Sequence, residues 1–339
     1  MLSNGYRYYY SQLDAAMQSA YEAMLAGVKN YADAILLNPN FALYESAISE
    51  LVRAVKLDNP SVFYLASQYQ YSIDGNAIWY KPQYLFDRAA LQMMEYQLLN
   101  TVDNIVNTAI GWGMNDYDKE LALHDYLIQN VAYAADSQWQ QNPPEIIYTA
   151  YGALVNRQAV CSGFAHALKL LLDRFGIDCL VVTGDSFMPD STVLIAHAWN
   201  IVNINQHFYH VDATWDAPTN KNPAELFHHY FNVTDQEIAI DHQWQRDMPS
   251  CYATEYNYFV HQGLNVADES TLMQWLQHAI GNKNPSLVFK YSGGNSVMDN
   301  DKLNAMIADS LQQFGYNSLS WSLSFNDRQK IFNVEFSYG

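Results

Sequence analysis

The chain has 339 residues, of which 50% are hydrophobic and only 15% are charged, a composition typical of a folded globular protein and not of a disordered one. Its formal net charge of −18 repels nucleic acid and anionic membrane surfaces, and no stretch reaches the length of a membrane span. We therefore expect neither a nucleic-acid partner nor a membrane partner. The oligomeric state stays open.

The first segment, residues 1–112, is predicted to be a helical N-terminal region. Apolar residues recur at helical spacing over residues 10–29, and again from Pro39 until Asn59-Pro60 ends the run. Pro82 is expected to start a third helix, which continues towards the end of the region.

The second segment, residues 113–250, combines helices with short strands. An amphipathic helix is expected over residues 118–133, and a longer helix begins just after Cys161 and runs to Phe175. Three short apolar runs typical of strands follow, over residues 178–183, 195–202 and 207–212.

The third segment, residues 251–339, is predicted to be a separate small α/β unit. A strand, a helix, a second strand and a second helix are expected in turn over residues 256–260, 270–280, 287–291 and 301–314. Apolar residues then alternate over residues 319–325 and 332–336, which predicts a hairpin with one buried face.

Three cysteines are present, Cys161, Cys179 and Cys251. An odd and low count argues against a disulfide framework and leaves at least one thiol free in a monomer. Cys179 lies in an apolar run and is expected to be a buried structural thiol. The first ten residues contain no apolar segment of a signal peptide, so a cytoplasmic protein is the default expectation. A secreted protein whose leader had been removed would look the same.

Cys161, His197 and Asp212 provide a thiol, an imidazole and a carboxylate in an order that suits a nucleophile, its base and the group that orients the base. Cys161 precedes a predicted helix, whose N-terminal partial charge and free N–H groups favour a thiolate and could stabilise an oxyanion. Ser162 and Gly163 leave room for a substrate backbone. If the fold brings the three groups together, the chemistry they suit is acyl transfer on amides or esters.

The two predicted strands that carry His197 and Asp212 are joined by a short loop, and its length decides whether the two side chains share a face. A two-residue turn at residues 204–205 would place them directly opposite, with Cβ atoms about 4.5–5.5 Å apart. A turn at residues 205–206 would leave them diagonal on the same face. A three-residue loop would move one of them to the other face.

Several motifs surround these residues: Cys161-Ser162-Gly163-Phe164-Ala165, His197-Ala198-Trp199-Asn200, Tyr209-His210-Val211-Asp212-Ala213-Thr214-Trp215-Asp216, and, at the flanks, His124-Asp125-Tyr126, His229-Tyr230-Phe231-Asn232 and Asp241-His242. Together they resemble the transglutaminase-like superfamily, which includes transglutaminases, bacterial cysteine peptidases and peptide N-glycanases. The resemblance spans residues 115–245 and is greatest to bacterial members of unknown substrate.

The resemblance implies an α+β fold with a papain-like or transglutaminase-like catalytic core, in which the helix carrying the cysteine packs on an antiparallel sheet. It implies Cys161 as the nucleophile, His197 as general base and acid, and Asp212 as the orienting carboxylate. Animal transglutaminases carry a Gly-Gln-Cys-Trp motif where this chain has Ala-Val-Cys-Ser at residues 159–162. Glutamine–lysine crosslinking and calcium dependence are therefore not implied.

The function that the resemblance implies is that of a cysteine-dependent amide hydrolase or acyltransferase, working through a thioester on a protein or peptide substrate and without a cofactor. Peptidase, deamidase and transamidase activities are not separated by the sequence. A non-catalytic binding or scaffold protein with the same fold stays open as an alternative, as does a glycan amidase of the peptide N-glycanase type.

Other side chains near the motifs are weaker candidates for substrate binding. Trp199 and Trp215 flank the triad residues and are expected to be core or pocket walls, with substrate contact as the alternative. Gln158 lies three residues before Cys161 and could supply a side-chain amide to an oxyanion hole. Four further histidines lack metal-ligand spacing, so no metal site is predicted from His207, His210, His228 and His229.

Overall fold

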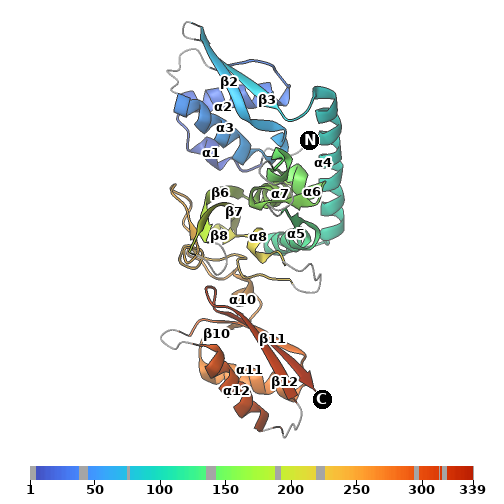
Figure 1. Cartoon of the computed structure of the whole chain (residues 1–339), viewed down its shortest axis with the longest axis vertical. Coiled ribbons are helices and arrows are strands. Elements are labelled where there is room, and N and C mark those ends of the chain that lie inside the picture. Colours follow the sequence, from blue (N-terminus) through green and yellow to red (C-terminus); the bar gives the residue numbers. More distant parts are fainter. Residues whose placement is uncertain are drawn as a thin grey trace.

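The computed structural model describes residues 5–37, 45–74, 77–134, 143–187, 192–218, 226–293, 298–312, 314 and 319–338. The N-terminal region, the central core and the C-terminal unit follow one another along the longest axis of the molecule (Figure 1). Within these ranges, no helix has both the length and the hydropathy that crossing a bilayer requires.

The N-terminal region contains a three-stranded antiparallel sheet, in the order β1–β3–β2, beside its helices. Its elements are α1 (Tyr8–Ser11), α2 (Ala15–Lys29), β1 (Ile35–Leu37), α3 (Glu45–Asp58), the 3₁₀ helix η1 (Pro60–Val62), β2 (Leu65–Asp74), β3 (Ala77–Tyr84) and α4 (Arg88–Ala109). Helix α4 runs along the side of both this region and the central core (Figure 1).

The prediction that Pro82 starts a helix is wrong, because Pro82 lies in β3, paired with Tyr69. The register of β2 is irregular just before Tyr69, and such irregular positions are where a sheet tolerates a residue without an N–H. The helix instead begins at Arg88, where the Asp87 side chain accepts a hydrogen bond from the Ala90 N–H at 2.9 Å. The expected start of the preceding helix, Pro39, lies outside the described residues.

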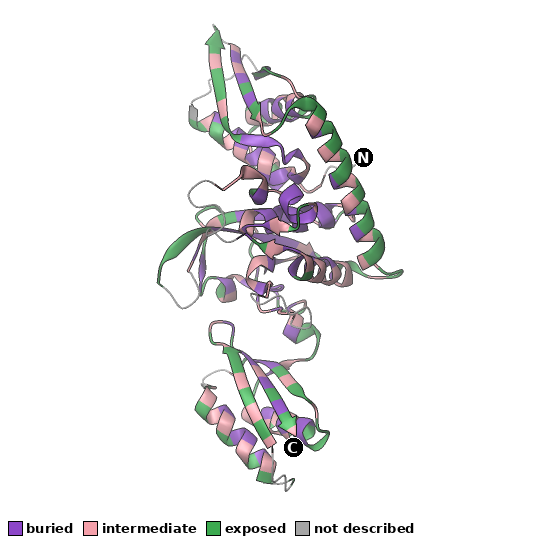
Figure 2. Ribbon diagram, turned by 45° about the vertical axis from the view of Figure 1, so that its right-hand side comes forward, coloured by how far each residue is buried: buried purple, intermediate pink, exposed green. Residues whose placement is uncertain are grey.

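The central core is a helix packed on a four-stranded antiparallel sheet, in the order β8–β7–β6–β9. Its strands are β6 (Cys179–Phe187), β7 (Leu194–Ile204), β8 (His207–Val211) and β9 (His242–Gln243). Helix α7 (Cys161–Asp173) packs on β6 and β7, and it is buried from Gly163 to its end. Figure 2 shows buried residues concentrated here, at the middle of the molecule. The predicted α+β class and helix-on-sheet core are confirmed.

Further elements complete the central part of the chain. They are α5 (Asp116–Asn130), β4 (Ala132–Tyr133), η3 (Glu145–Tyr148), α6 (Ala150–Leu154), β5 (Gln158–Ala159), α8 (Ala213–Asp216) and α9 (Asp235–Ile238). Of these, α5, η3, α6, β5 and α8 pack directly against α7. The helix expected over residues 118–133 begins slightly earlier, at a capping box in which the side chains of Asn115 and Asp118 each accept the other's backbone N–H.

The turn between β7 and β8 settles which register the hairpin adopts. Ile204 pairs with His207, so the turn consists of Asn205 and Gln206, with φ angles of 51° and 69°. Two successive residues at positive φ are the mark of a type I′ turn, which matches the twist of a tight hairpin. Of the two possible two-residue turns, the one at residues 205–206 is therefore the one observed.

The C-terminal unit is a four-stranded sheet, in the order β10–β11–β13–β12, with two helices. Its elements, preceded by α10 (Tyr258–His261), are β10 (Asn265–Val266), α11 (Glu269–Gly281), β11 (Ser286–Tyr291), α12 (Asn300–Gln312), β12 (Leu319–Asn326) and β13 (Ile331–Tyr338). The predicted hairpin is confirmed as β12–β13. The strand expected over residues 256–260 is wrong, because Asn257 caps α10 there by accepting the Phe259 N–H at 3.2 Å.

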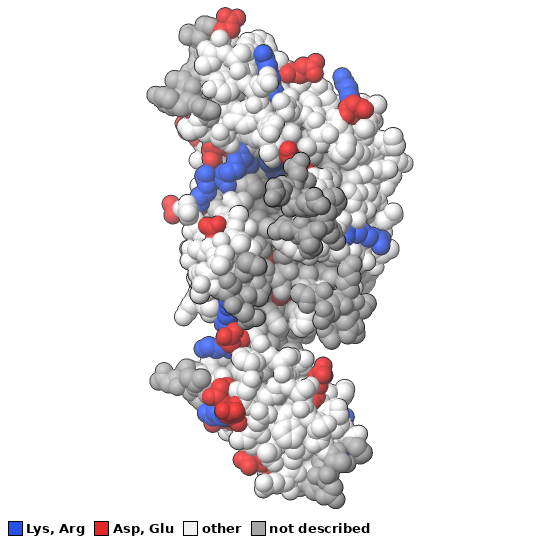
Figure 3. Space-filling view, viewed as in Figure 1, with Lys and Arg blue, Asp and Glu red and all other residues white. Residues whose placement is uncertain are grey.

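Among the described residues, hydrophobic packing forms two main cores, one large and one smaller, and two further clusters of three buried residues each. The large cluster of buried residues extends from Tyr8 to Ala253 and joins the N-terminal region to the central core, whereas the C-terminal unit has its own cluster from Val266 to Phe336. The predicted boundaries near residues 112 and 250 stay predictions. On the face shown in Figure 3, charged side chains form small separate groups of both signs.

Candidate active site

Cys161 is the first residue of α7 and is partly exposed. The residue before it, Val160, offers no side-chain cap, so the N–H groups of the first turn are not satisfied by a capping side chain. The side chain of Cys161 is among the groups that raise the pKa of His197, which lies in β7, so the two side chains are near each other. The fold therefore brings the thiol and the imidazole together at a helix N-terminus.

His197 is 7% exposed, and its Nε2 lies 2.6 Å from Oδ2 of Asp212. Burial opposes a charged imidazole, but the Asp212 carboxylate and the Cys161 side chain outweigh burial and raise the pKa of His197 to about 10. His197 is thus protonated in the folded protein at neutral pH. A protonated imidazole between a thiol and a carboxylate is the arrangement that a cysteine nucleophile requires.

Asp212 follows the last residue of β8 and caps α8. Its Oδ1 accepts hydrogen bonds from the backbone N–H groups of Thr214 at 2.9 Å and Trp215 at 3.2 Å. Asp212 is fully buried, and burial alone would raise its pKa, yet His197 and His242 hold the pKa far below its usual value. The carboxylate is therefore ionised and fixed in place.

His242 is a site residue that spacing alone does not reveal. Its Nε2 lies 3.0 Å from the same Oδ2 of Asp212 that His197 contacts, and its Nδ1 lies 2.5 Å from Oδ1 of Asp241. Strand β9 brings His242 to the sheet edge by pairing with Ser186 of β6. In the sequence, only the resemblance of Asp241-His242 to the family motif indicates that this pair lies near the site.

The two tryptophans differ in exposure. Trp199 is 1% exposed, donates from Nε1 to Nδ1 of His210 at 2.9 Å, and lies stacked beside His197 with ring centroids 6.0 Å apart. Trp215 is partly exposed, and its ring centroid lies 6.1 Å from that of His197. Trp199 is therefore a core residue, whereas Trp215 is accessible to a substrate.

The remaining predicted substrate-binding residues lie around the start of α7. Gln158 is partly exposed in β5, where it pairs with Ala132. Gly163 is buried, and a Cβ there would come within 2.6 Å of the Ile147 carbonyl oxygen, so its small size serves close packing against η3. A role for these residues in substrate binding stays a prediction.

Ser162 faces a pocket of about 270 Å³ between the N-terminal region and α7. Its Oγ donates to the Tyr148 carbonyl at 3.1 Å and lies 3.3 Å from Nδ1 of His166. The wall of the pocket combines polar side chains, among them Lys56, Glu145 and His166, with the apolar residues Pro60, Val62, Phe63, Leu65, Leu85 and Ala150. The N-terminal region therefore shapes the surface next to the nucleophile.

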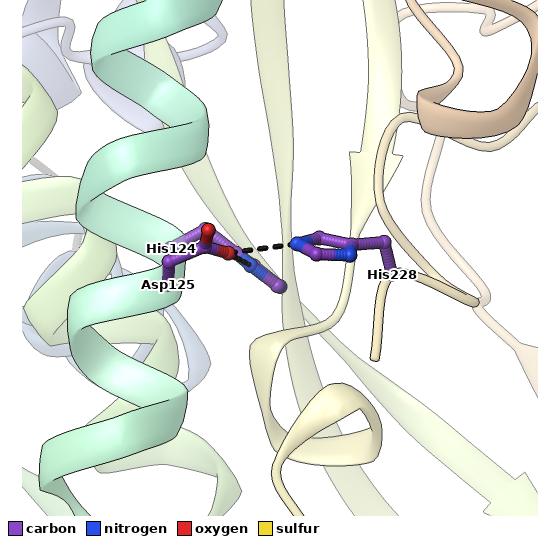
Figure 4. A group of neighbouring side chains, drawn as sticks. All are labelled: His124, Asp125 and His228. Atoms are coloured by element: carbon purple, nitrogen blue, oxygen red, sulfur yellow. Dashed lines mark hydrogen bonds and ion pairs between the residues drawn. The ribbon is translucent and has the colours of Figure 1, made fainter. Parts of the chain in front are cut away.

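Within the described parts of the chain, three groups of side chains have the composition of metal ligands, and one of them, His124, Asp125 and His228, is drawn in Figure 4. Asp125 Oδ1 lies 3.3 Å from Nδ1 of His124 and 2.8 Å from Nε2 of His228. The other nitrogen of His124 lies 3.2 Å from Asp216, and the two carboxylates overcome burial and raise the pKa of His124 to about 9. A protonated imidazole already supplies the positive charge at this group.

A second such group contains His210, Asp235 and Cys251. His210 accepts the Trp199 indole N–H at Nδ1, so its proton must lie on Nε2, where Asp235 Oδ1 accepts it at 2.9 Å. A metal would have to displace that proton. The third group is His197, Asp212 and His242, and it contains two of the three predicted triad residues. Of the histidines considered from the sequence, His207 pairs with Glu255 at 2.8 Å and Nδ1 of His229 lies 3.3 Å from Asn326.

Residues 103–213 match the family model described as "Transglutaminase-like superfamily", which confirms the resemblance over those residues. No curated protein matches the chain. A solved structure named "a Putative Cysteine Protease from Cytophaga hutchinsonii" is 18% identical with a TM-score of 0.29, and the match covers 47% of this chain and 64% of that one. A TGase structure is 12% identical with a TM-score of 0.30, covering 61% and 54%. The chain thus spans less than two thirds of either solved protein.

Proposed function

Because residues 103–213 belong to the transglutaminase-like superfamily, we propose that this protein is a cysteine-dependent amide hydrolase or acyltransferase that acts on a protein or peptide. One observation carries the proposal: Cys161 stands at a helix N-terminus, near enough to His197 to raise the pKa of that imidazole, and Nε2 of His197 lies 2.6 Å from the buried Asp212. These groups come from three separate elements. Their chemical order is that of a nucleophile, a proton carrier and an orienting carboxylate.

In the acylation step, Sγ of Cys161 attacks the carbonyl carbon of a carboxamide and forms an S–C bond. N–H groups of the first turn of α7 are positioned to stabilise the oxyanion that develops on the carbonyl oxygen. The C–N bond then breaks, and the nitrogen leaves with the proton of His197. The product of this step is a thioester on Cys161.

In the deacylation step, water or an amine attacks the thioester carbon and gives a proton to His197 as the S–C bond breaks. Water yields a carboxylic acid, and an amine yields a new amide. Asp212 keeps the imidazole in one orientation throughout, since its own carboxylate is fixed by two backbone N–H groups.

The proposal is tested with a chloroacetamide probe at neutral pH, followed by mass mapping of the labelled peptides. The chain supplies its own controls, because Cys179 and Cys251 are buried and burial raises the pKa of both thiols. Labelling is expected at Cys161, to be absent in C161A and to be slower in H197Q. Labelling of Cys179 or Cys251 in place of Cys161 would contradict the proposed activation.

Turnover separates an enzyme from a binding protein with the same fold. Incubation with a casein digest and hydroxylamine is expected to give peptide hydroxamates, since hydroxylamine resolves a thioester in place of water. C161A is the matched control, because it removes only the thiol. A wild-type protein that is labelled at Cys161 yet gives no hydroxamate or hydrolysis product on any peptide would favour a binding function.

A further inference from the structure

The Asp212 carboxylate is shared between two imidazoles. Its Oδ2 lies 2.6 Å from Nε2 of His197 and 3.0 Å from Nε2 of His242, while its Oδ1 accepts two backbone N–H groups. We infer that His242 is a positioning residue for the triad, a second cation that fixes Asp212 and tunes how readily His197 releases its proton. The inference rests on the proposed role of Cys161, but it makes a prediction about His197 that needs no substrate.

The contacts of His242 determine its charge. One ring nitrogen faces Asp212 and the other faces Asp241, at 3.0 Å and 2.5 Å, and an ionised carboxylate only accepts hydrogen bonds. Both nitrogens of His242 must therefore carry a proton. Burial opposes this charge, but the two carboxylates outweigh it and raise the pKa of His242.

Both the backbone and the side chain of His242 are held by close packing. On the sheet side, β9 approaches β6 so closely that a Cβ on Gly184 would lie 2.1 Å from the Gln243 carbonyl oxygen. The ring of His242 packs between aromatic rings, with centroids 4.9 Å from Trp215 and 5.0 Å from Trp199. The imidazole therefore has little freedom to turn away from Asp212.

Behind His242, the C-terminal unit takes part in holding Asp241. Oδ2 of Asp241 accepts the Tyr230 hydroxyl at 2.6 Å, and the Arg328 guanidinium lies 3.8 Å from the same oxygen. Arg328 belongs to the turn between β12 and β13, and its guanidinium also lies 5.9 Å from the centre of the Trp215 ring. Gln329 of the same turn donates to the Glu237 carbonyl at 3.2 Å. The two units thus meet directly behind the triad.

The charges around His242 set the sign of its effect on His197. The acidic groups that face it are Asp212 and Asp241, and the basic groups are His197 and Arg328. The Tyr230 hydroxyl acts indirectly, by donating to Asp241, and His210 is more distant. His197 and His242 compete for one carboxylate oxygen, and two cations this close repel each other. A charged His242 therefore weakens the hold of Asp212 on the His197 proton. This helps His197 to give that proton to the leaving amine.

The experiment compares His242→Gln with His210→Gln by following the histidine ring signals in NMR titrations. Gln keeps one N–H for Asp212 but carries no charge. His210 is an equally buried histidine bonded to one carboxylate, and burial lowers its pKa, so replacing it removes no cation. In H242Q the midpoint of the His197 titration is expected to rise by about one pH unit. In H210Q the midpoint should not change.

The same variants are assayed for chloroacetamide labelling of Cys161 and for hydroxamate formation. H242Q is expected to lower hydroxamate formation by roughly tenfold, because an upward shift of about one pH unit makes His197 a weaker proton donor to the leaving amine. Asp241→Asn is the alternative variant if H242Q does not fold. It removes the carboxylate that keeps Nδ1 of His242 protonated, so the midpoint of the His197 titration should again rise. A titration that is unchanged or lower in a folded H242Q or D241N protein overturns the inference. If Cys161 produces no thioester but the titration moves as expected, the proposed function fails and the coupling of His242 to His197 stands.

Discussion

His197 and Asp212 form a 2.6 Å hydrogen bond although the register of their hairpin leaves them diagonal and not directly opposite each other. The contact is possible because β8 ends at Val211, and Asp212 turns to become the N-cap of α8. Two backbone N–H groups then hold one carboxylate oxygen and leave the other for the imidazole. The geometry of the triad thus depends on a helix cap as much as on the sheet.

Asp212→Asn should reduce hydroxamate formation by about 10²–10⁴-fold, because an amide no longer balances the charge of the imidazole and can hold it in the wrong tautomer. The rate is measured with the casein digest and hydroxylamine. Thr214→Ala is the matched control, since Thr214 donates to Asp212 through its backbone N–H and the substitution keeps that donor. Wild-type turnover in D212N would remove Asp212 from the mechanism.

The stability of the protein should fall as the solution becomes alkaline. The pKa of His197 is raised to about 10 and that of His124 to about 9, mainly by carboxylates that outweigh burial. Because the folded state binds these protons more tightly than the unfolded chain, their contribution is complete below about pH 6.5 and disappears as pH rises through 9 to 10.

Urea unfolding at a series of pH values between about 6.5 and 10 measures this loss as a falling free energy of unfolding. In H124Q, which removes one of the two groups, the fall up to pH 9 should be smaller than in the wild type. A free energy of unfolding that rises through this range in the wild type would contradict the charges assigned to His197 and His124.

The positions of Cys161, His197 and Asp212 could be predicted from sequence in part, because two of their features are local, while their catalytic roles stay a proposal. Cys161 starts a helix that its flanking residues announce, and His197 and Asp212 lie on one hairpin whose parity follows from a short loop. His242 could not be placed in this way. It lies thirty residues after Asp212 and reaches it only because β9 pairs with β6 across the sheet, a contact that no local pattern encodes.

The errors in the predicted elements have the same origin. Pro82 is a good residue for the start of a helix, but pairing with β2 overrides that local preference. The apolar run over residues 256–260 suits a strand, yet Asn257 caps a helical turn there, and its side chain lies within 3.4 Å of the Phe231 carbonyl oxygen. In both places tertiary contacts decide between two structures that the local sequence allows.

Lys169→Met should lower the free energy of unfolding by about 3–5 kcal/mol, because it removes the ammonium group that faces the buried Asp173 carboxylate. Nζ of Lys169 lies 3.2 Å from Asp173 and donates to the carbonyls of Tyr6 and Cys179, each at 2.8 Å. The double variant K169M/D173N should recover part of the loss, since the uncompensated charge is gone. Equal unfolding free energies for K169M and the wild type would show that the ion pair contributes nothing.

Glu120→Gln tests the role of a buried carboxyl group on α5. Glu120 is fully buried, accepts one hydrogen bond from Asn232 at 2.9 Å, and its other oxygen has no partner among the described residues. Burial is the main cause that raises its pKa to about 8. The folded state therefore favours the protonated form, and this contribution to stability is complete below about pH 4.5 and lost as pH rises to 8.

Glutamine has the shape of the protonated acid but cannot ionise. The wild type should therefore lose stability relative to E120Q between about pH 4.5 and 8, by at most about 1.4 kcal/mol per pH unit, and E120Q should be the more stable protein above pH 8. Urea unfolding of the two proteins at matched pH values measures the difference. The isosteric amide keeps the Asn232 contact and creates no cavity, so a difference that does not vary with pH would show that folding does not raise the pKa of Glu120.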